Sequence, residues 1–338
     1  MKKTLKLTVW ASLLASAAGI AQGETNWRYV GVVPPAHDYA KIISAGFERV
    51  AERTDGALTI DYLSYGETPY KAVDALTLVR DGLVDMSEWV PAYNASTYPL
   101  LAGPELPFVM TELKDAAGFQ EATLNAWNTP TIAAYKAGIL DDHSAQTVMT
   151  GFYDPINIWF SDEVTDVAGM TGKKVRAFSP EQAEFLNALG ASPVNIAASE
   201  AYTGLQRGVI DGVITGAGAV VGFKWNEVLN SGFTTNVLLL SLDMIVSDAK
   251  LADLPEDVRA VLLEEMANVQ SEMLEAMPKL YDEKLAVLKE GGMTITQPSE
   301  EMYRSFHDMA VTSVYPGWAE RAGPDAVKIL ADFGIALK

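Results

Sequence analysis

Short apolar runs alternate along the chain with segments whose apolar residues recur at helical spacing, and this alternation restricts the possible folds. Residues 27–33 and 58–62 have the pattern of strands, and residues 39–50 between them have the periodicity of a helix. The same alternation returns in the middle of the chain. Alternating strands and helices are typical of βαβ units. The sequence therefore predicts an α/β fold with two groups of such units, over residues 24–150 and 151–235.

Residues that flank the expected helices indicate where those helices begin. Ser179 is a good N-cap, Pro180 suits the first turn, and Gln182 can complete a capping box. Ser199 is expected to cap the following helix. The glycine-containing loop 216–222 follows an expected strand, but its spacing does not match a dinucleotide-binding loop. We interpret this loop as a place of close backbone packing or ligand approach.

A long acidic stretch from Pro255 to Gly291 has helical character, and Pro278 within it is expected to kink or split the helix. No low-complexity linker separates the two groups of βαβ units, and no solenoid repeat is present. The absence of a linker favours two closely packed lobes, with the chain crossing between them more than once.

The first 23 residues have the pattern of a secretory signal peptide. Lys2, Lys3 and Lys6 form a positive segment, residues 5–18 are almost wholly apolar, and small residues near Gly23 suit cleavage. The alternative is an N-terminal membrane anchor. The apolar segment is short for a span of about 20 residues, and no stop-transfer pattern follows. We therefore expect export to the periplasm with cleavage near Gly23, and no insertion of the mature chain into the membrane.

Composition excludes several classes of function. The chain has no cysteine, so disulfides, thiolate catalysis and a lipid-modified N-terminal cysteine are impossible. Its formal net charge is −19, and loss of the lysines in the leader makes the mature chain more acidic still. Such a surface repels nucleic acids and anionic membranes. Any anionic ligand must then be held by a few local cations, and the chain has only nine arginines.

Arg176 is the strongest candidate for binding an anion. It lies within the expected strand 174–178, where burial would remove its hydration and require an anionic partner. A planar guanidinium suits bidentate recognition of a carboxylate, and the helix that begins at Pro180 presents free N–H groups nearby. The alternative is a structural ion pair with one of the 44 acidic residues. The residues alone do not decide between the two interpretations.

Motifs of known enzyme classes are missing from the sequence. His37, His143 and His307 are too scattered for a zinc motif, and neither H-E-x-x-H nor G-x-S-x-G occurs. We therefore predict no catalytic residues, no metal site and no cofactor, although a metal bridging ligand and protein stays open. His37 follows the end of the first expected strand, where α/β proteins bind ligands, but a solvated loop histidine is an alternative.

Several aromatic residues lie near expected loops, among them Trp89, Tyr153, Phe178 and Trp225. Trp89 follows an expected strand end. These side chains could form the apolar side of a pocket, although ordinary core packing explains each of them equally well.

A set of motifs distributed over the mature chain resembles one known family. The most specific are Gly172-Lys173-Lys174-Val175-Arg176 and the run from Ala201 to Gly212. Further matching segments are Val32–His37, Phe47–Gly56, Asp74–Met86, Leu189–Val194 and Leu254–Arg259. In their order and spacing, these segments resemble the extracytoplasmic solute-binding proteins of TRAP transporters, the DctP type.

The resemblance implies a two-lobed periplasmic-binding-protein fold with crossing segments and a long helix in the C-terminal region. We expect residues 24–150 plus about 236–285 to form lobe I, and 151–235 plus about 286–338 to form lobe II. A small organic acid would be enclosed in the cleft between the lobes. The resemblance also implies a membrane permease as partner, and a monomer as the usual form.

Family members use the arginine of the G-K-K-[IV]-R strand to bind the ligand carboxylate, which implies that role for Arg176. Many members also have an asparagine ligand contact where this chain has Thr215. The members that bind sialic acid use a second arginine in the preceding strand, but residues 154–160 contain none, so we expect a smaller carboxylate. We add Asn195, His37 and Glu67 as candidate polar contacts.

The sequence thus predicts a periplasmic solute-binding protein that captures a small organic carboxylate and delivers it to a TRAP-type permease. Two alternatives stay open: a secreted enzyme that uses the same cleft, and a ligand sensor for a membrane receptor. The sequence does not identify the carboxylate.

Overall fold

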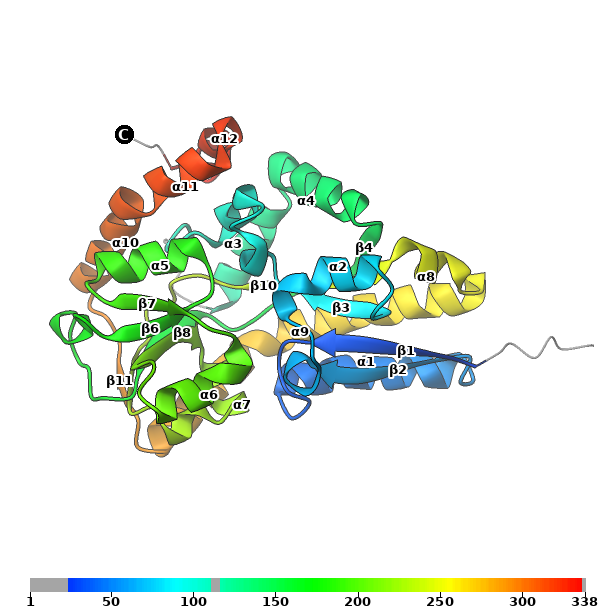
Figure 1. The fold of residues 1–338 in the computed structure, drawn as a ribbon, viewed down its shortest axis with the longest axis horizontal. Helices are drawn as coiled ribbons and strands as arrows, with labels where there is room; N and C mark the ends of the chain where they lie inside the picture. The colour runs from blue at the N-terminus through cyan, green and yellow to red at the C-terminus, as the bar shows by residue number, and fades with distance from the viewer. Residues whose placement is uncertain (1–23, 111–115, 336–338) are drawn as a thin grey trace, which may run out of the picture.

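The structure is a computed structural model that describes residues 24–110 and 116–335, so the expected signal peptide lies outside the described residues. The chain forms an α/β fold with two sheets and a long helix, α9, as predicted (Figure 1). We call the part built on the first sheet the first lobe and the part built on the second sheet the second lobe. The exact residue limits of the lobes stay a prediction.

The first lobe is built on a five-stranded sheet of order β2-β1-β3-β10-β4. Its strands are β1 (Thr25–Gly31), β2 (Leu58–Ser64), β3 (Met86–Trp89), β4 (Ala145–Phe152) and β10 (Ser241–Ser247). Strand β1 is parallel to β2 and β3, whereas β10 is antiparallel to β3 and β4. The helices that accompany this sheet are α1 (Asp38–Arg53), α2 (Ala75–Arg80) and α8 (Asp248–Asp253).

The second lobe is built on a six-stranded sheet of order β11-β9-β5-β8-β6-β7. Its strands are β5 (Ile156–Phe160), β6 (Lys174–Ala177), β7 (Ser192–Asn195), β8 (Gly212–Gly216), β9 (Ser231–Phe233) and β11 (Thr294–Thr296). Strand β6 is parallel to both of its neighbours, β7 and β8. The helices between these strands are α5 (Pro180–Ala188), α6 (Ala198–Gln206) and α7 (Ala217–Gly222).

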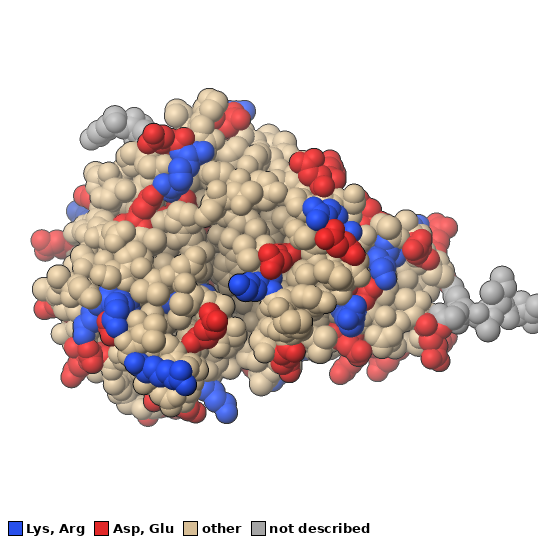
Figure 2. Space-filling model, in the orientation of Figure 1, with Lys and Arg blue, Asp and Glu red and all other residues tan. Residues whose placement is uncertain are grey.

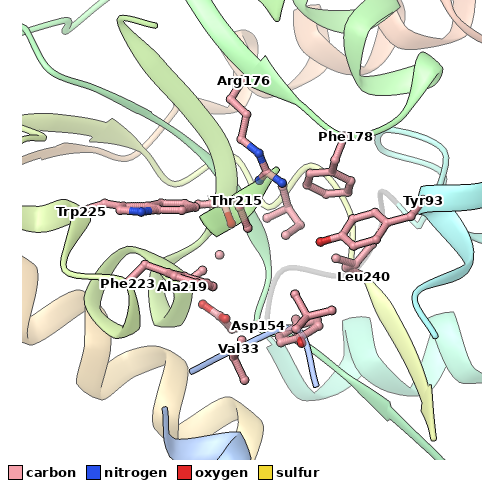
Figure 3. A pocket seen from close by; sticks show the side chains of 15 residues that line it. Val33, Tyr93, Asp154, Arg176, Phe178, Thr215, Ala219, Phe223, Trp225 and Leu240 are labelled. Atoms are coloured by element: carbon pink, nitrogen blue, oxygen red, sulfur yellow. The ribbon is translucent and has the colours of Figure 1, made fainter. Parts of the chain in front are cut away.

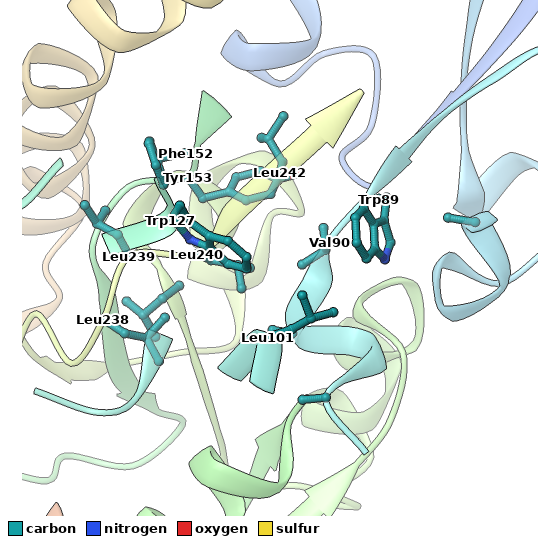
Figure 4. Packing of buried hydrophobic residues seen from close by; sticks show 14 of the residues in the cluster. Trp89, Val90, Leu101, Trp127, Phe152, Tyr153, Leu238, Leu239, Leu240 and Leu242 are labelled. Atoms are coloured by element: carbon teal, nitrogen blue, oxygen red, sulfur yellow. The ribbon is translucent and has the colours of Figure 1, made fainter. Parts of the chain in front are cut away.

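Two segments cross between the lobes and pair with each other. One leads from β4 to β5, and the other leads from β9 to β10. The Tyr153 N–H donates to the Leu240 carbonyl (2.9 Å), and the Ile156 N–H donates to the Leu238 carbonyl (2.9 Å). Figure 4 shows the leucines of the second segment packed beside Phe152 and Tyr153. These backbone bonds and buried side chains fix the crossing point.

Helix α9 (Glu256–Glu290) is continuous over 35 residues and contacts both lobes. It packs against α1 and β4 of the first lobe and against α7 of the second. Pro278 lies inside it without ending it, so the helix is not split there; the alternative expectation, a kink at this proline, stays a prediction. Met277 and Tyr281 on either side of the proline are buried, and such tertiary packing offsets the hydrogen bond that a proline removes.

The remaining helices are α3 (Ala116–Trp127), α4 (Pro130–Asp142), α10 (Glu300–Ser313), α11 (Tyr315–Ala322) and α12 (Pro324–Asp332). Of these helices, α4 packs against β4 of the first lobe, and α10 packs against α5 of the second. Trp318 of α11 donates to the Pro99 carbonyl (2.7 Å), and the Tyr315 hydroxyl donates to the Pro107 carbonyl (2.9 Å). The C-terminal helices are thereby tied to the segment that follows β3.

Two predicted local features differ in the structure. Helix α6 begins at Ala198 with Ala197 as its N-cap, so Ser199 is not the cap; Glu200 instead accepts a hydrogen bond from the Ala197 N–H (3.2 Å). The glycine-rich segment expected as a loop contains helix α7 (Ala217–Gly222). The prediction for α5 is confirmed at its cap, because the Ser179 hydroxyl accepts a hydrogen bond from the Gln182 N–H (3.2 Å).

The described helices include none that is both long enough and apolar enough to span a membrane. Figure 2 shows acidic and basic side chains interspersed over one face of the molecule rather than gathered by sign.

The contact between α1 and α9 depends on a close approach at Gly46. A Cβ atom there would lie 2.2 Å from Val269 Cγ2 of α9, whereas a Cβ at Gly138 in α4 would meet nothing within 4 Å. We expect Gly46→Ala to lower the free energy of unfolding by about 1–3 kcal/mol through overpacking. Gly138→Ala should raise it by about 0.5–1 kcal/mol through helix propensity. Urea denaturation of both variants checks this, and equal effects would contradict the proposed packing.

Candidate functional site

A pocket lies between the lobes, and side chains from both lobes and from the crossing segments line it (Figure 3). It encloses about 400 Å³ of empty space, open solvent at its mouth included. Tyr93, on the turn that follows β3, comes from the first lobe, and Arg176 on β6 comes from the second. The pocket therefore lies where movement of one lobe against the other would change its shape.

Arg176 is buried in this pocket, with 3% of its surface exposed. Its Nε donates to the Ile196 carbonyl (3.0 Å), and its guanidinium lies 5.2 Å from the centre of the Phe178 ring. Within the described ranges, no aspartate or glutamate forms an ion pair with it. Burial lowers the pKa of Arg176, and a hydrogen bond with the Tyr93 hydroxyl acts in the opposite direction. The described protein thus supplies this cation only with neutral partners.

Thr215 and three aromatic residues form the second-lobe wall of the pocket. Thr215 lies on β8, and its carbonyl accepts a hydrogen bond from Trp159 Nε1 (2.9 Å). Phe223 stacks on Trp225 with 5.0 Å between ring centres, and Phe178 meets Tyr93 edge-on at 5.6 Å. This wall offers one hydroxyl and a large apolar surface beside the guanidinium.

Asp154 also lines the pocket, although the sequence analysis did not single it out. Its Oδ2 accepts a hydrogen bond from the Gly218 N–H (2.9 Å) at the start of α7. A Cβ at Gly216 would lie 2.5 Å from Asp154 Oδ1, so this position requires glycine. The expected close backbone packing of the glycine-rich segment is therefore confirmed, and a buried acid is what it packs against.

The structure brings together five of the nine predicted site residues. Arg176, Thr215, Tyr153, Phe178 and Trp225 all line the pocket. Tyr153 also donates a hydrogen bond through its hydroxyl to the buried Glu88, so part of its role is structural.

Three of the other predicted residues lie outside the pocket lining. Trp89 is fully buried in the core, where its Nε1 donates to Asn94 Oδ1 (2.9 Å). Glu67 is exposed and accepts hydrogen bonds from the Ser64 N–H (2.9 Å) and hydroxyl (2.7 Å). Asn195, at the end of the edge strand β7, is exposed.

His37 likewise lies outside the pocket lining, at a contact between the lobes. It is the N-cap of α1, where its Nδ1 accepts a hydrogen bond from the Tyr39 N–H (3.2 Å). A Cβ at Gly222 of α7 would lie 2.4 Å from His37 Cδ2. Burial lowers the pKa of His37 to about 4. The ring is therefore a neutral, structural group that joins α1 to α7.

The two-lobed fold agrees with the comparisons with known proteins. The model of the family described as bacterial extracellular solute-binding protein, family 7, matches residues 32–320. The chain belongs to this family, DctP. It is therefore a solute-binding protein of the TRAP type and not an enzyme.

Individual relatives extend over most of this DctP-family chain. A solute-binding protein of Sulfitobacter sp. strain NAS-14.1 is 26% identical over 269 residues, which cover 78% of each chain. The crystal structure of DctP7, a Bordetella pertussis extracytoplasmic solute receptor binding pyroglutamic acid, has a TM-score of 0.80 at 21% identity, covering 91% of this chain and 99% of that one. A TRAP periplasmic solute-binding protein of Roseobacter denitrificans, with bound L-galactonate, has a TM-score of 0.79 at 20% identity. The match covers 92% of this chain and 99% of that one. At these identities the two structures establish the fold.

The depressed pKa of His37 predicts a specific loss of stability in acid. An unfolded histidine titrates near pH 6.5, so between pH 6.5 and about 4 the unfolded chain binds a proton that the folded chain does not. Stability is therefore lost as the pH falls through this range. The wild type should have a higher free energy of unfolding than His37→Asn at pH 7. We expect this difference to shrink by about 1–3 kcal/mol between pH 7 and pH 4. Urea denaturation at both pH values measures it, and a constant difference would show that His37 does not titrate this way.

Proposed function

We propose that this DctP-family protein is a periplasmic receptor that binds a small organic carboxylate at Arg176 and delivers it to a TRAP permease. The observation that carries the proposal is the buried guanidinium, which has no acidic partner among the described residues. An uncompensated buried charge is costly, and a carboxylate from outside the chain would supply the missing partner. The two-pronged geometry of a guanidinium matches a carboxylate better than it matches a single oxygen.

The remaining lining residues support the same ligand class. Thr215 could donate or accept one hydrogen bond, and Tyr153, Phe178 and Trp225 would cover the apolar part of a small acid. DctP7 and the Roseobacter denitrificans protein have pyroglutamic acid and L-galactonate as ligands, and both of these are carboxylic acids. Asn195, Trp89, Glu67 and His37 do not line the pocket, so the proposal gives them no direct contact with the ligand.

Closure of the two lobes would complete the site. Tyr93 reaches Arg176 and Phe178 from the other lobe, so part of the binding surface exists only when the lobes are together. A hinge at the two crossing segments would let the ligand enter and leave. Enclosure would also strengthen the charge interaction, because it excludes water from the pocket.

The location and the partner of the protein are part of the proposal. The first 23 residues have the pattern of a signal peptide, which supports export. The TRAP receptors are a periplasmic family, and their ligands pass to membrane permease subunits. A released ligand should therefore be chemically unchanged, which nuclear magnetic resonance of the recovered ligand can verify.

Removal of the guanidinium is the direct test of this proposal. A thermal-shift screen of small carboxylates first identifies a ligand, and isothermal titration calorimetry then measures its Kd for the wild type and for Arg176→Ala. Truncating one side of a desolvated charge pair costs about 2–5 kcal/mol, so the Kd should rise by roughly 30-fold to several thousand-fold.

Arg207→Ala is the matched control, because Arg207 is an exposed arginine at the end of α6 in the same lobe. Its Kd should equal that of the wild type. Unchanged affinity in Arg176→Ala would disprove the proposed role of Arg176.

A further inference from the structure

Asp154 is a second buried charge in the pocket, and it faces the cavity from the side opposite Arg176 (Figure 3). It belongs to the segment that crosses from β4 to β5, and only 2% of its surface is exposed. Arg176 and Asp154 do not form an ion pair with each other. One pocket thus holds a basic and an acidic side chain that are not paired with each other.

The surroundings of Asp154 fix its carboxylate without neutralising it. Oδ2 accepts a hydrogen bond from the Gly218 N–H (2.9 Å), and the absence of side chains at Gly216 and Gly218 allows the close approach of α7. In the described part of the chain, no lysine or arginine forms an ion pair with Asp154. The nearby Lys284 ammonium is paired with Asp38 instead.

The protonation state of Asp154 determines what it can bind. Burial raises its pKa to about 6, while backbone hydrogen bonds from Gly218 and Ala217 and the charge of Lys284 hold the pKa down. The group is therefore mostly ionised at neutral pH. An ionised carboxylate is only an acceptor of hydrogen bonds, so a ligand next to it must supply a donor.

The Asp154 carboxylate already accepts backbone hydrogen bonds at the start of α7, but a carboxylate can accept about four. A ligand with a carboxylate and no donor would satisfy Arg176 and make no hydrogen bond with Asp154. We propose that Asp154 accepts a hydrogen bond from an N–H or O–H group of the ligand, and thereby selects carboxylic acids that carry such a donor outside the carboxylate group itself. This inference rests on the proposed function. The ligand class is then amino, imino, lactam or hydroxy acids, and plain hydrocarbon carboxylates are rejected.

The test compares carboxylates that differ by a single donor. Pyroglutamate is paired with 5-oxotetrahydrofuran-2-carboxylate, in which the lactam N–H is replaced by oxygen; lactate is paired with propionate, and mandelate with phenylacetate. Isothermal titration calorimetry at pH 7.5 gives both Kd values of each pair. A hydrogen bond to a charged group contributes about 1.5–3 kcal/mol, so the donor-bearing member of the pair that fits the pocket should bind about 10- to 150-fold more tightly.

Asp154→Asn tests whether this preference comes from Asp154. The asparagine oxygen can still accept from the Gly218 N–H, and its amide group then offers a donor to the pocket in place of an acceptor. The preference should fall to within about threefold or reverse, because the donor-free analogue now finds a partner. Asp166→Asn is the matched control, since Asp166 is an exposed acid of the same lobe that also accepts a hydrogen bond from a glycine N–H, that of Gly169 (2.8 Å). The Asp166→Asn variant should keep the wild-type preference for donor-bearing ligands. Circular dichroism verifies that both variants are folded.

The possible failures are distinguishable. Equal binding of both members of every pair to the wild type, with binding still lost in Arg176→Ala, overturns the role of Asp154 and leaves the proposed function standing. The role of Asp154 is also overturned if Asp154→Asn keeps the full wild-type preference for donor-bearing ligands. If the carboxylate found by the thermal-shift screen binds equally well to the wild type and to Arg176→Ala, the carboxylate proposal fails, and the inference about Asp154 fails with it.

Discussion

The buried guanidinium of Arg176, which has no acidic partner among the described residues, is the feature on which the account depends. Its strand, β6, lies between β7 and β8 in the interior of a sheet, and this position removes the side chain from bulk water. The Ile196 carbonyl and the Tyr93 hydroxyl are neutral partners, so they satisfy donors without balancing the charge. The rest of the fold brings other surfaces to this cation: Tyr93 from the first lobe, the aromatic wall from the second, and Asp154 from the crossing segment.

Most of the fold could be predicted from patterns along the chain. Strands and helices alternate with clear periodicity, and the Ser179 cap and the long helix were both recognisable. The errors occur where tertiary contacts outweigh local preference. Pro278 stays inside α9 because the helix is packed against both lobes, and the segment after Gly216 continues as a helix because its glycines allow it to lie against Asp154 and His37.

The site could be predicted only in part, because position in the sequence does not give the direction of a side chain. Arg176 was recognisable from its residue type and its place in a strand. Trp89 ends β3 and Glu67 follows the end of β2, places where ligand contacts often lie, but the Trp89 side chain is buried in the core and Glu67 caps a short turn. The sequence around Asp154 does not indicate a role in the site, because it shows only a single acid between two apolar strands. Its place in the pocket results from the packing of the lobes and α7 around it.

A crystal structure of the protein with its tightest-binding carboxylate is the most direct test of the central claim. The account predicts that both carboxylate oxygens lie within about 2.7–2.9 Å of Arg176 nitrogens, as in charge-assisted bidentate pairs. The contrary result would be a guanidinium paired with an aspartate or glutamate of the protein and a ligand carboxylate held at another place. That result would remove the reason for assigning the site to Arg176.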